Sequence, residues 1–324
     1  MTPRENFLHF LKNEPYEWIP NSNDIRMFSP AFLQDPVARG MISQQDPYIG
    51  ELGGKDLLGV EWRFDPNAGG SMEVGKLCRE LEEWEEKLVF PDLDAMDWEG
   101  CVRENAAYLH TDLLIETVIY TGFFERLISL VGFEAAAVAL IDEDQQETVH
   151  KLFAKLADFY VELIARLNQY FGVELVILHD DWGTQKSTMF STDTHKEMIA
   201  PYIKRVVDGA HKLGVYVEMH SCGKIEAMLP NMIDAGLDTW VGQAIVDKRM
   251  LVETYGDRFK FCVNVRDDRI SDDDAVEALF RSLLQIYNGR HIWFSLSRKF
   301  TPAQCSCIEE IIHTEGKVCP LASF

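Results

Sequence analysis

Short apolar runs and amphipathic segments alternate along most of this 324-residue chain. From about residue 112, runs rich in β-branched and aromatic residues end in polar clusters, which predicts strands. Segments with an apolar residue at every third or fourth position follow them, which predicts helices. The predicted strands are 113–120, 173–179, a strand that begins at 215, 239–243, 259–265 and 291–296. The predicted helices are 123–131, 134–141, 148–170, 194–213, 225–235, 247–255, 272–287 and 302–313, and a second helix can start at Pro201 within 194–213.

The first third of the chain has a different pattern. Thr2, Pro3 and Glu5 combine a capping box with a proline at the first helical position, so they predict the start of a helix. Residues 22–110 are irregular apart from a predicted strand at 59–64. We expect this region to form loops that cover one end of the fold.

Strands that alternate with helices of about 10–20 residues are typical of βαβ units and a parallel sheet. Six clear units after an irregular start favour an α/β fold of the (β/α)8 TIM-barrel type. An open, doubly wound sheet is the alternative. The chain contains neither a G-x-G-x-x-G nor a G-x-x-x-x-G-K-[ST] motif, so the usual nucleotide signatures are missing. Without a linker or repeat, residues 1–324 are expected to form a single domain.

The net charge of −22 narrows the class of partner. It argues against nucleic acid, whose binding depends on Lys and Arg, and against anionic membranes. The start of the chain has no apolar segment typical of a signal peptide, and no apolar run reaches the length of a membrane span. Seven scattered cysteines favour a cytoplasmic protein with free thiols or metal ligands. The sequence is also compatible with a homodimer.

The strand that begins at 215 ends in a chemically unusual cluster. Because side chains alternate along a strand, Glu218, His220 and Cys222 share one face. An imidazole and a thiol two residues apart can both reach one ion, and a catalytic zinc ion takes three such ligands. The alternative is a buried histidine beside an inert cysteine. For a third ligand, Cys305 lies at the start of the last helix, and Cys307 faces a different direction.

In a TIM barrel, the active site lies at the carboxyl ends of the strands. Two acids, Asp180 and Asp181, follow the strand 173–179 and are, with Glu218, the candidate catalytic acids. Alternation allows only one of the pair to face the barrel mouth and leaves open which one. Capping of a following helix or turn is the alternative role for both. The neighbouring His179, like His195, is expected in a loop or at the surface.

Other polar or aromatic residues at predicted strand ends are candidates for substrate binding, although an aromatic side chain there can equally belong to the core. These candidates are Asn21, Tyr120, Trp182, Gln243 and Asn264.

Several motifs together resemble the uroporphyrinogen decarboxylase superfamily. The most specific is His220-Ser221-Cys222-Gly223, followed by Gly236-Leu237-Asp238. The others are Thr2-Pro3-Arg4-Glu5-Asn6-Phe7-Leu8, Glu14-Pro15, Ile19-Pro20, His179-Asp180-Asp181-Trp182-Gly183, Ala210-His211-Lys212-Leu213-Gly214, Tyr255-Gly256-Asp257-Arg258 and Thr301-Pro302. Within the superfamily, the chain resembles the cobalamin-dependent methyltransferases more than the true decarboxylases.

This resemblance implies a (β/α)8 barrel and a methyl transfer between a small molecule and a corrinoid (cobalamin) carried by a separate protein. It implies a zinc ion held by a His-x-Cys pair, matched by His220 and Cys222, and by a later cysteine. The zinc ion would activate the methyl acceptor or the methyl donor as a Lewis acid. The alternatives are a decarboxylase that acts on a smaller acid and a barrel that binds a small molecule without turnover.

Two departures from the family pattern matter. The decarboxylases hold their polyanionic substrate with an arginine-rich motif after the first strand, where this chain has a single arginine, Arg26, and an acid, Asp24. Porphyrinogen decarboxylation is therefore not expected. The methyltransferases place their later cysteine just after the last strand, where this chain reads Ser295-Leu296-Ser297. The third ligand is thus lost, replaced by an acid, or displaced to Cys305.

Overall fold

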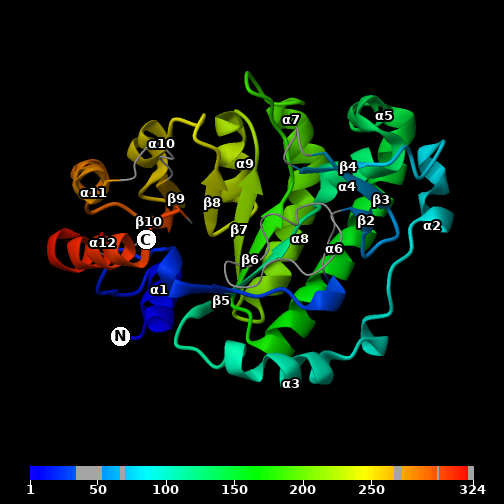
Figure 1. The fold of residues 1–324 in the computed structure, drawn as a ribbon. Coiled ribbons are helices and arrows are strands. Elements are labelled where there is room, and N and C mark those ends of the chain that lie inside the picture. Colours follow the sequence, from blue (N-terminus) through cyan, green and yellow to red (C-terminus); the bar gives the residue numbers. More distant parts are fainter. Residues whose placement is uncertain (34–52, 66–69, 266–271, 298, 320–324) are drawn as a thin grey trace. The chain divides into compact units, whose positions relative to one another are not determined.

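A computed structural model describes residues 1–33, 53–65, 70–265, 272–297 and 299–319 (Figure 1). The chain divides into two compact units. Unit 1 comprises Met1–Arg26, Thr111–Leu114 and Asp238–Phe324, and unit 2 comprises Met27–His110 and Ile115–Leu237. The sequence-based expectation of a single domain over 1–324 stays a prediction.

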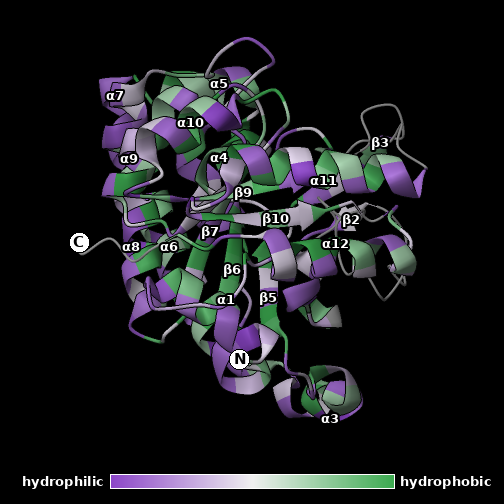
Figure 2. Cartoon of the chain, turned by 90° about the vertical axis from the view of Figure 1, so that its left-hand side faces the viewer, coloured by the Kyte–Doolittle hydropathy of each residue, from purple (hydrophilic) through white to green (hydrophobic). Residues whose placement is uncertain are grey.

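Unit 2 contains a series of parallel strands with helices between them. The strands β5, β6 and β7 are hydrogen-bonded neighbours in that order, and both pairs are parallel. Their residues are mostly apolar (Figure 2), because helices cover a parallel sheet of this class on its outer side. The strands are β5 (Leu114–Ile119), β6 (Leu175–His179) and β7 (Tyr216–Ser221). The helical segments are α4 (Phe123–Val131), α5 (Phe133–Ala139), α6 (Glu143–Phe171), α7 (Thr192–Thr194), η6 (His195–Ile199), α8 (Ala200–His211), η7 (Glu226–Met228) and α9 (Leu229–Asp234).

The longest helix, α6, shows why these segments fold as helices. Asp142 caps its first turn through the backbone N–H of Asp144, and Gly172 ends it in the left-handed conformation. Val149, Leu152 and Leu156 begin a buried stripe with helical spacing. Helix α8 packs beside α6 (Figure 1).

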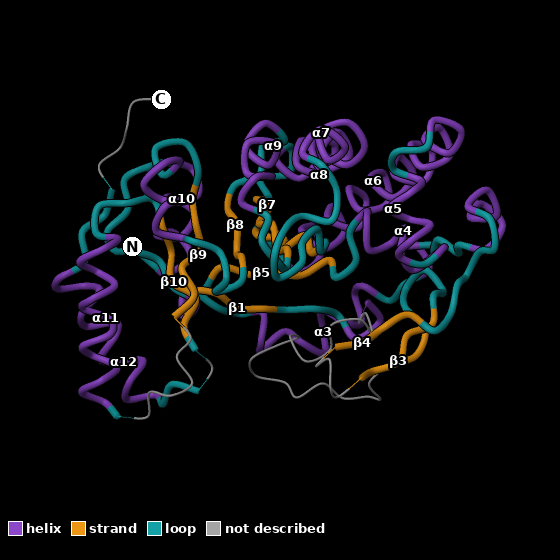
Figure 3. The backbone as a smooth tube through the Cα atoms, turned by 90° about the horizontal axis from the view of Figure 1, so that it is seen from above, coloured by secondary structure: helices purple, strands orange, loops and turns teal. Residues whose placement is uncertain are grey.

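The segment before β5 forms a small antiparallel sheet of three strands, β2 (Gly54–Lys55), β3 (Glu61–Asp65) and β4 (Gly70–Glu73), with β3 and β4 side by side (Figure 3). A buried ion pair ties it to helix α4: the Arg126 guanidinium lies 2.6 Å from the Asp56 carboxylate. Asp56 also accepts the indole N–H of Trp62 at 2.9 Å. The remaining helical segments of this region are η2 (Ala31–Leu33), η4 (Leu81–Glu83), α2 (Trp84–Lys87), η5 (Leu93–Ala95) and α3 (Trp98–Leu109).

Unit 1 has its own parallel strands, in the order β8, β9 and β10. Helix α1 opens with the predicted capping box between Thr2 and Glu5, and α11 and α12 lie side by side (Figure 3). Its elements are α1 (Pro3–Lys12), η1 (Ser22–Asp24), β8 (Thr239–Gly242), α10 (Lys248–Tyr255), β9 (Lys260–Val265), α11 (Asp273–Tyr287), β10 (Ile292–Leu296) and α12 (Pro302–Glu315), while β1 (Ile25–Met27) crosses the boundary with unit 2.

The predicted alternation of strands and helices from residue 113 onward is confirmed, usually to within two residues. Within the segment predicted to be helical at 194–213, the second helix start expected at Pro201 is present. The turn η6 is π-helical, and α8 starts afresh at Ala200 with Pro201 at its first turn. Proline has no backbone N–H to continue the preceding ladder, so a new helix begins there. None of the helices in the described part of the chain combines the length and the apolar character needed to span a membrane.

Candidate functional site

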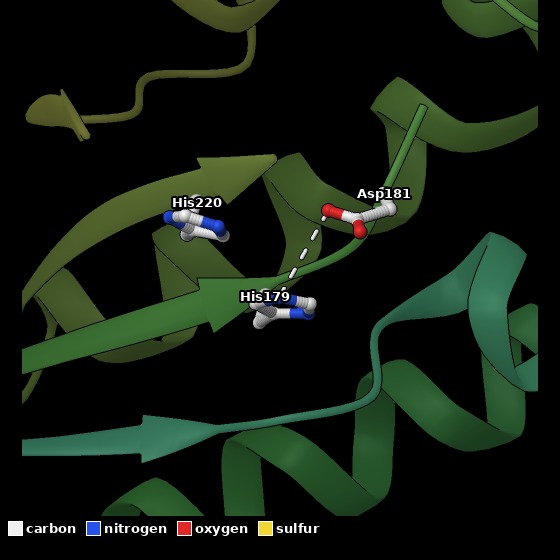
Figure 4. Close-up of side chains that lie close together, drawn as sticks. All are labelled: His179, Asp181 and His220. Carbon is white, nitrogen blue, oxygen red and sulfur yellow. Dashed lines mark ion pairs between the residues drawn. The ribbon is translucent and has the colours of Figure 1, made fainter. Parts of the chain in front are cut away.

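The register of two neighbouring strands of unit 2 brings two histidines together. In the parallel pair of β6 and β7, His179 lies level with His220. Their rings stack with centroids 4.8 Å apart and an interplanar angle of 13° (Figure 4). His179 is the last residue of β6 and His220 the second-last of β7, so both lie at the carboxyl ends, where α/β folds place their active sites.

The loops that follow these strands touch each other through glycines. Gly223 has a φ of +86°, and a Cβ built on it would lie 2.2 Å from the backbone carbon of Gly183. Only glycine permits this backbone conformation together with this close approach. The contact brings Asp181 to the β7 end, where its Oδ1 accepts the backbone N–H of Cys222 at 2.5 Å.

Four side chains at this edge offer metal-binding atoms. The nitrogen and oxygen donors of His179, Asp181 and His220 all lie within 4.8 Å of one another (Figure 4). The Sγ atom of Cys222 lies 3.8 Å from Nε2 of His220. Nε2 of His179 lies 3.9 Å from Oδ1 of Asp181. Two imidazoles, a carboxylate and a thiol are ligands that zinc accepts.

Glu125, in the first turn of α4, completes the surroundings of His179. Its Oε2 lies 2.8 Å from Nδ1 of the imidazole. Burial lowers the pKa of His179, but the charge and hydrogen bond of Glu125, with Asp181 and Asp180, outweigh it and raise that pKa to about 9. Burial raises the pKa of Glu125 to about 7, although His179 opposes the shift. The Glu125 carboxylate therefore favours the protonated form of the His179 imidazole.

The pKa of the Cys222 thiol is also raised, which for a thiol favours the neutral form. Burial and then the negative charge of Asp181 raise its pKa well above its usual range. A thiolate at this position needs a cation beside it. The two members of the sequence-predicted pair, His220 and Cys222, are adjacent in the structure, with Nε2 and Sγ 3.8 Å apart.

The two neighbouring acids have different surroundings. Asp181 is directed toward the histidines, and its side chain is 28% exposed. Asp180 is 0% exposed and is directed toward helix α4. It accepts the indole N–H of Trp182 at 2.8 Å and three backbone N–H groups at the α4 N-terminus. Burial raises the pKa of Asp180 to about 6, although the hydrogen bonds from Glu125 and Trp182 oppose the shift.

The expectation for His179 and His195 was wrong: neither lies at the surface. His179 belongs to the cluster at the β6 end. His195 is fully buried in the π-helical turn, against the ring of Trp182 at 4.4 Å between centroids. Burial lowers the pKa of His195 to about 3, so it is neutral. Trp182, a predicted substrate contact, is itself fully buried by these neighbours.

Two buried acids share the face of the histidines, nearer to the amino ends of the strands. Glu218 lies level with Ile177 of β6, and Glu116 of β5 lies level with Leu175. By alternation, both point to the side of His179 and His220. Glu218, the predicted third acid, is fully buried. Glu116 is 4% exposed, and burial raises its pKa to about 8.

We expect Glu116 to make the folding stability pH-dependent. Its raised pKa means that the folded state keeps a proton that the unfolded state loses above about pH 4.5, so its contribution to stability decreases as pH rises toward 8. We expect Glu116→Gln to remove a slope of up to about 1.4 kcal/mol per pH unit over this window. Urea denaturation of both proteins from pH 5 to pH 8 measures it. Equal slopes would show that Glu116 ionises normally.

Tyr120, another predicted substrate contact, follows Ile119 of β5, which lies level with Leu178, the residue before His179. It is buried and lines a mostly apolar cavity with Leu58, Arg126 and Phe159 among others. The cavity lies entirely within unit 2.

The remaining sequence-predicted residues belong to unit 1. Asn21 is buried and caps η1 by accepting the N–H of Asn23 at 2.9 Å. Asn264 on β9 donates its amide to the Gly242 carbonyl at 2.6 Å. Gln243 follows β8, and Cys305 lies in the first turn of α12, hydrogen-bonded to Asn23. For these four residues, a role at the site stays a prediction.

Comparison with known proteins shows what the chain is similar to. The family model described as uroporphyrinogen decarboxylase (URO-D) matches residues 114–293, more than half of the chain. No curated protein matches the chain in sequence. Among solved structures, a methyltransferase from Methanosarcina mazei is similar over 97% of this chain and 99% of its own, with a TM-score of 0.67 and 15% identity.

Two other solved structures are more distant. An endo-1,4-beta-xylanase from Caldicellulosiruptor owensensis covers 67% of this chain and 75% of its own at 10% identity, with a TM-score of 0.37. The 3-keto-D-glucoside 4-epimerase YcjR from E. coli covers 73% and 86% at 12% identity, with a TM-score of 0.35. The likeness to the methyltransferase concerns the fold, and it confirms the predicted α/β class with a TIM-like series of parallel strands.

Proposed function

Because this chain belongs to the uroporphyrinogen decarboxylase family, we propose that it is a methyltransferase that moves a methyl group between a small molecule and a corrinoid protein with the help of a zinc ion. One observation carries the proposal: Nε2 of His220 and Sγ of Cys222 lie 3.8 Å apart at the end of β7. The structural similarity to a protein named as a methyltransferase supports it.

The donor atoms fit a zinc ion. With Zn–N at about 2.0–2.1 Å and Zn–S at about 2.3 Å, tetrahedral geometry places nitrogen and sulfur about 3.5 Å apart. The His220–Cys222 separation is close to this value. His179 and Asp181 offer a second nitrogen and an oxygen within 4.8 Å of His220, so one of them could supply the third ligand inside unit 2 and leave the fourth position open for the substrate. Cys305 stays an alternative third ligand.

A bound zinc ion would supply Lewis acidity, either to keep a thiol substrate deprotonated or to polarise the atom that leaves the methyl group. The chain's own residues set the conditions for this chemistry. Asp181 is the candidate acid that faces the cluster and can take a proton from the substrate. Asp180 instead fixes the neighbouring helix. Tyr120, which follows the neighbouring strand β5, is a candidate contact for the methyl-bearing molecule.

The proposal implies two partners besides the small molecule: a corrinoid protein that carries cobalamin, and, in a homodimer, a second copy of the chain. It is tested by the zinc content of the purified protein and by methyl transfer from methylcobalamin to a thiol. We expect about one zinc ion per chain and a transfer activity that chelation abolishes. Absence of both zinc and transfer would overturn the proposal.

Decarboxylation of a small acid is the second candidate. The family name favours it, and the imidazole of His179, whose protonated form Glu125 favours, could hold a carboxylate. Release of CO₂ from a small carboxylic acid, without methyl transfer, would establish this function in place of the first.

A further inference from the structure

Resting on the proposed function, we propose that Glu125 is the positioning residue that holds His179 as a ligand of the metal ion. Glu125 belongs to none of the sequence motifs, and its side chain approaches the site from helix α4, outside the strands that carry the donors. Its Oε2 lies 2.8 Å from Nδ1 of His179. The side chains are only 18% and 9% exposed, so water competes weakly for this contact.

The contact decides which imidazole nitrogen can bind a metal. A hydrogen bond from Nδ1–H to a carboxylate fixes the tautomer of a histidine and leaves Nε2 for the ion. Nε2 of His179 faces Asp181 Oδ1 at 3.9 Å, on the side where the other donors gather. An ion that binds there takes the place of the Nε2 proton, which passes to solvent.

Glu125 is itself held in place from the strand side. Its backbone N–H donates to Oδ1 of Asp180 at 2.8 Å, and the N–H groups of Phe123 and Phe124 donate to Oδ2 at 3.1 and 3.0 Å. A Cβ on Gly122 would lie 2.5 Å from the Asp180 Cβ, so the chain approaches this carboxylate closely. Asp180 thus anchors the first turn of α4, and that turn presents Glu125 to His179.

This role can be separated from that of an ordinary buried ion pair, because metal affinity and folding stability are measured independently. In a titration with Zn²⁺ or Co²⁺ against a chelator, we expect Glu125→Ala to lower affinity about 10–100-fold. Glu125→Gln keeps an oxygen that accepts the Nδ1–H, so this variant should lose less metal affinity than Glu125→Ala. The matched control is Glu134→Ala, an exposed acid in the first turn of α5, with unchanged affinity.

A double-mutant cycle makes the test specific. If Glu125 acts through His179, then Glu125→Ala adds little to the affinity loss of His179→Ala, and both change the visible absorption of the Co²⁺ form in the same way. Equal affinities of wild type and Glu125→Ala would overturn this inference and leave the proposed function standing. A wild-type protein that binds neither ion would overturn both. A loss of thermal stability without a change in affinity would reduce Glu125 to a structural residue.

Discussion

Cys222→Ala and His220→Ala are each expected to lose the bound zinc ion and to reduce methyl transfer by at least about 10³-fold. The two donor atoms lie 3.8 Å apart and come from the same strand end, so neither has an equivalent substitute in its position. Removal of one ligand from a zinc site leaves too few donors to hold the ion against water. Metal content after dialysis and the rate of transfer from methylcobalamin measure the two effects.

Two further cysteine variants serve as comparison. Cys307→Ala removes a thiol from α12 that is not a candidate ligand, so it should leave zinc content and activity unchanged. Cys305→Ala tests whether Cys305 is the third zinc ligand. Loss of zinc from this variant would place a ligand in the last helix, whereas retention would favour Asp181 and His179. Full zinc content in Cys222→Ala would contradict the assignment of the His-x-Cys pair.

Asp180→Ala is expected to destabilise the fold by about 3–5 kcal/mol, because it removes the acceptor of four buried donors. These are the indole N–H of Trp182 and the backbone N–H groups of Phe123, Phe124 and Glu125, at 2.8 to 3.1 Å. With the carboxylate gone, the α4 N-terminus also loses a negative charge at its positive end. Urea denaturation at constant pH gives the change in the free energy of unfolding.

The matched comparison is Asp272→Ala. Asp272 caps α11 through the N–H of Asp274 at 2.9 Å, but it is exposed, so water can replace the lost acceptor. We expect a cost of about 1 kcal/mol for this ordinary cap. If both variants lost the same free energy of unfolding, the burial of Asp180 would not contribute, and Asp180 would act as an ordinary helix cap.

Much of the fold could be read from the sequence because local patterns determine it. The capping box of Thr2 and Glu5 predicted the start of α1, and the β/α alternation predicted the strands and helices that follow residue 113. The family motif His220-Ser221-Cys222-Gly223 also pointed to the edge of the sheet where the donors of His179, Asp181 and His220 gather. These signals depend on spacing along one element, and a single strand or helix already contains them.

The site beyond that motif could be predicted only in part. The sequence predicted that His179 and Asp181 lie at the end of a strand, but it did not predict that His179 lies level with His220. Register between strands depends on packing and hydrogen bonding across the sheet, and it is not encoded by either strand alone. The same reason applies to Glu125, which reaches the site from the helix that follows a neighbouring strand.

By itself, then, the sequence determined the parallel α/β class and the pairing of an imidazole with a thiol two residues apart, since alternation along a strand places both on one face. Only the tertiary structure distinguished the surroundings of the two neighbouring acids, Asp180 and Asp181. Asp180 is enclosed by the α4 N-terminus, while Asp181 is carried to Cys222 by the contact of Gly183 with Gly223. Local propensity treats the two aspartates alike, and their different surroundings arise from segments about 40 to 60 positions away along the chain.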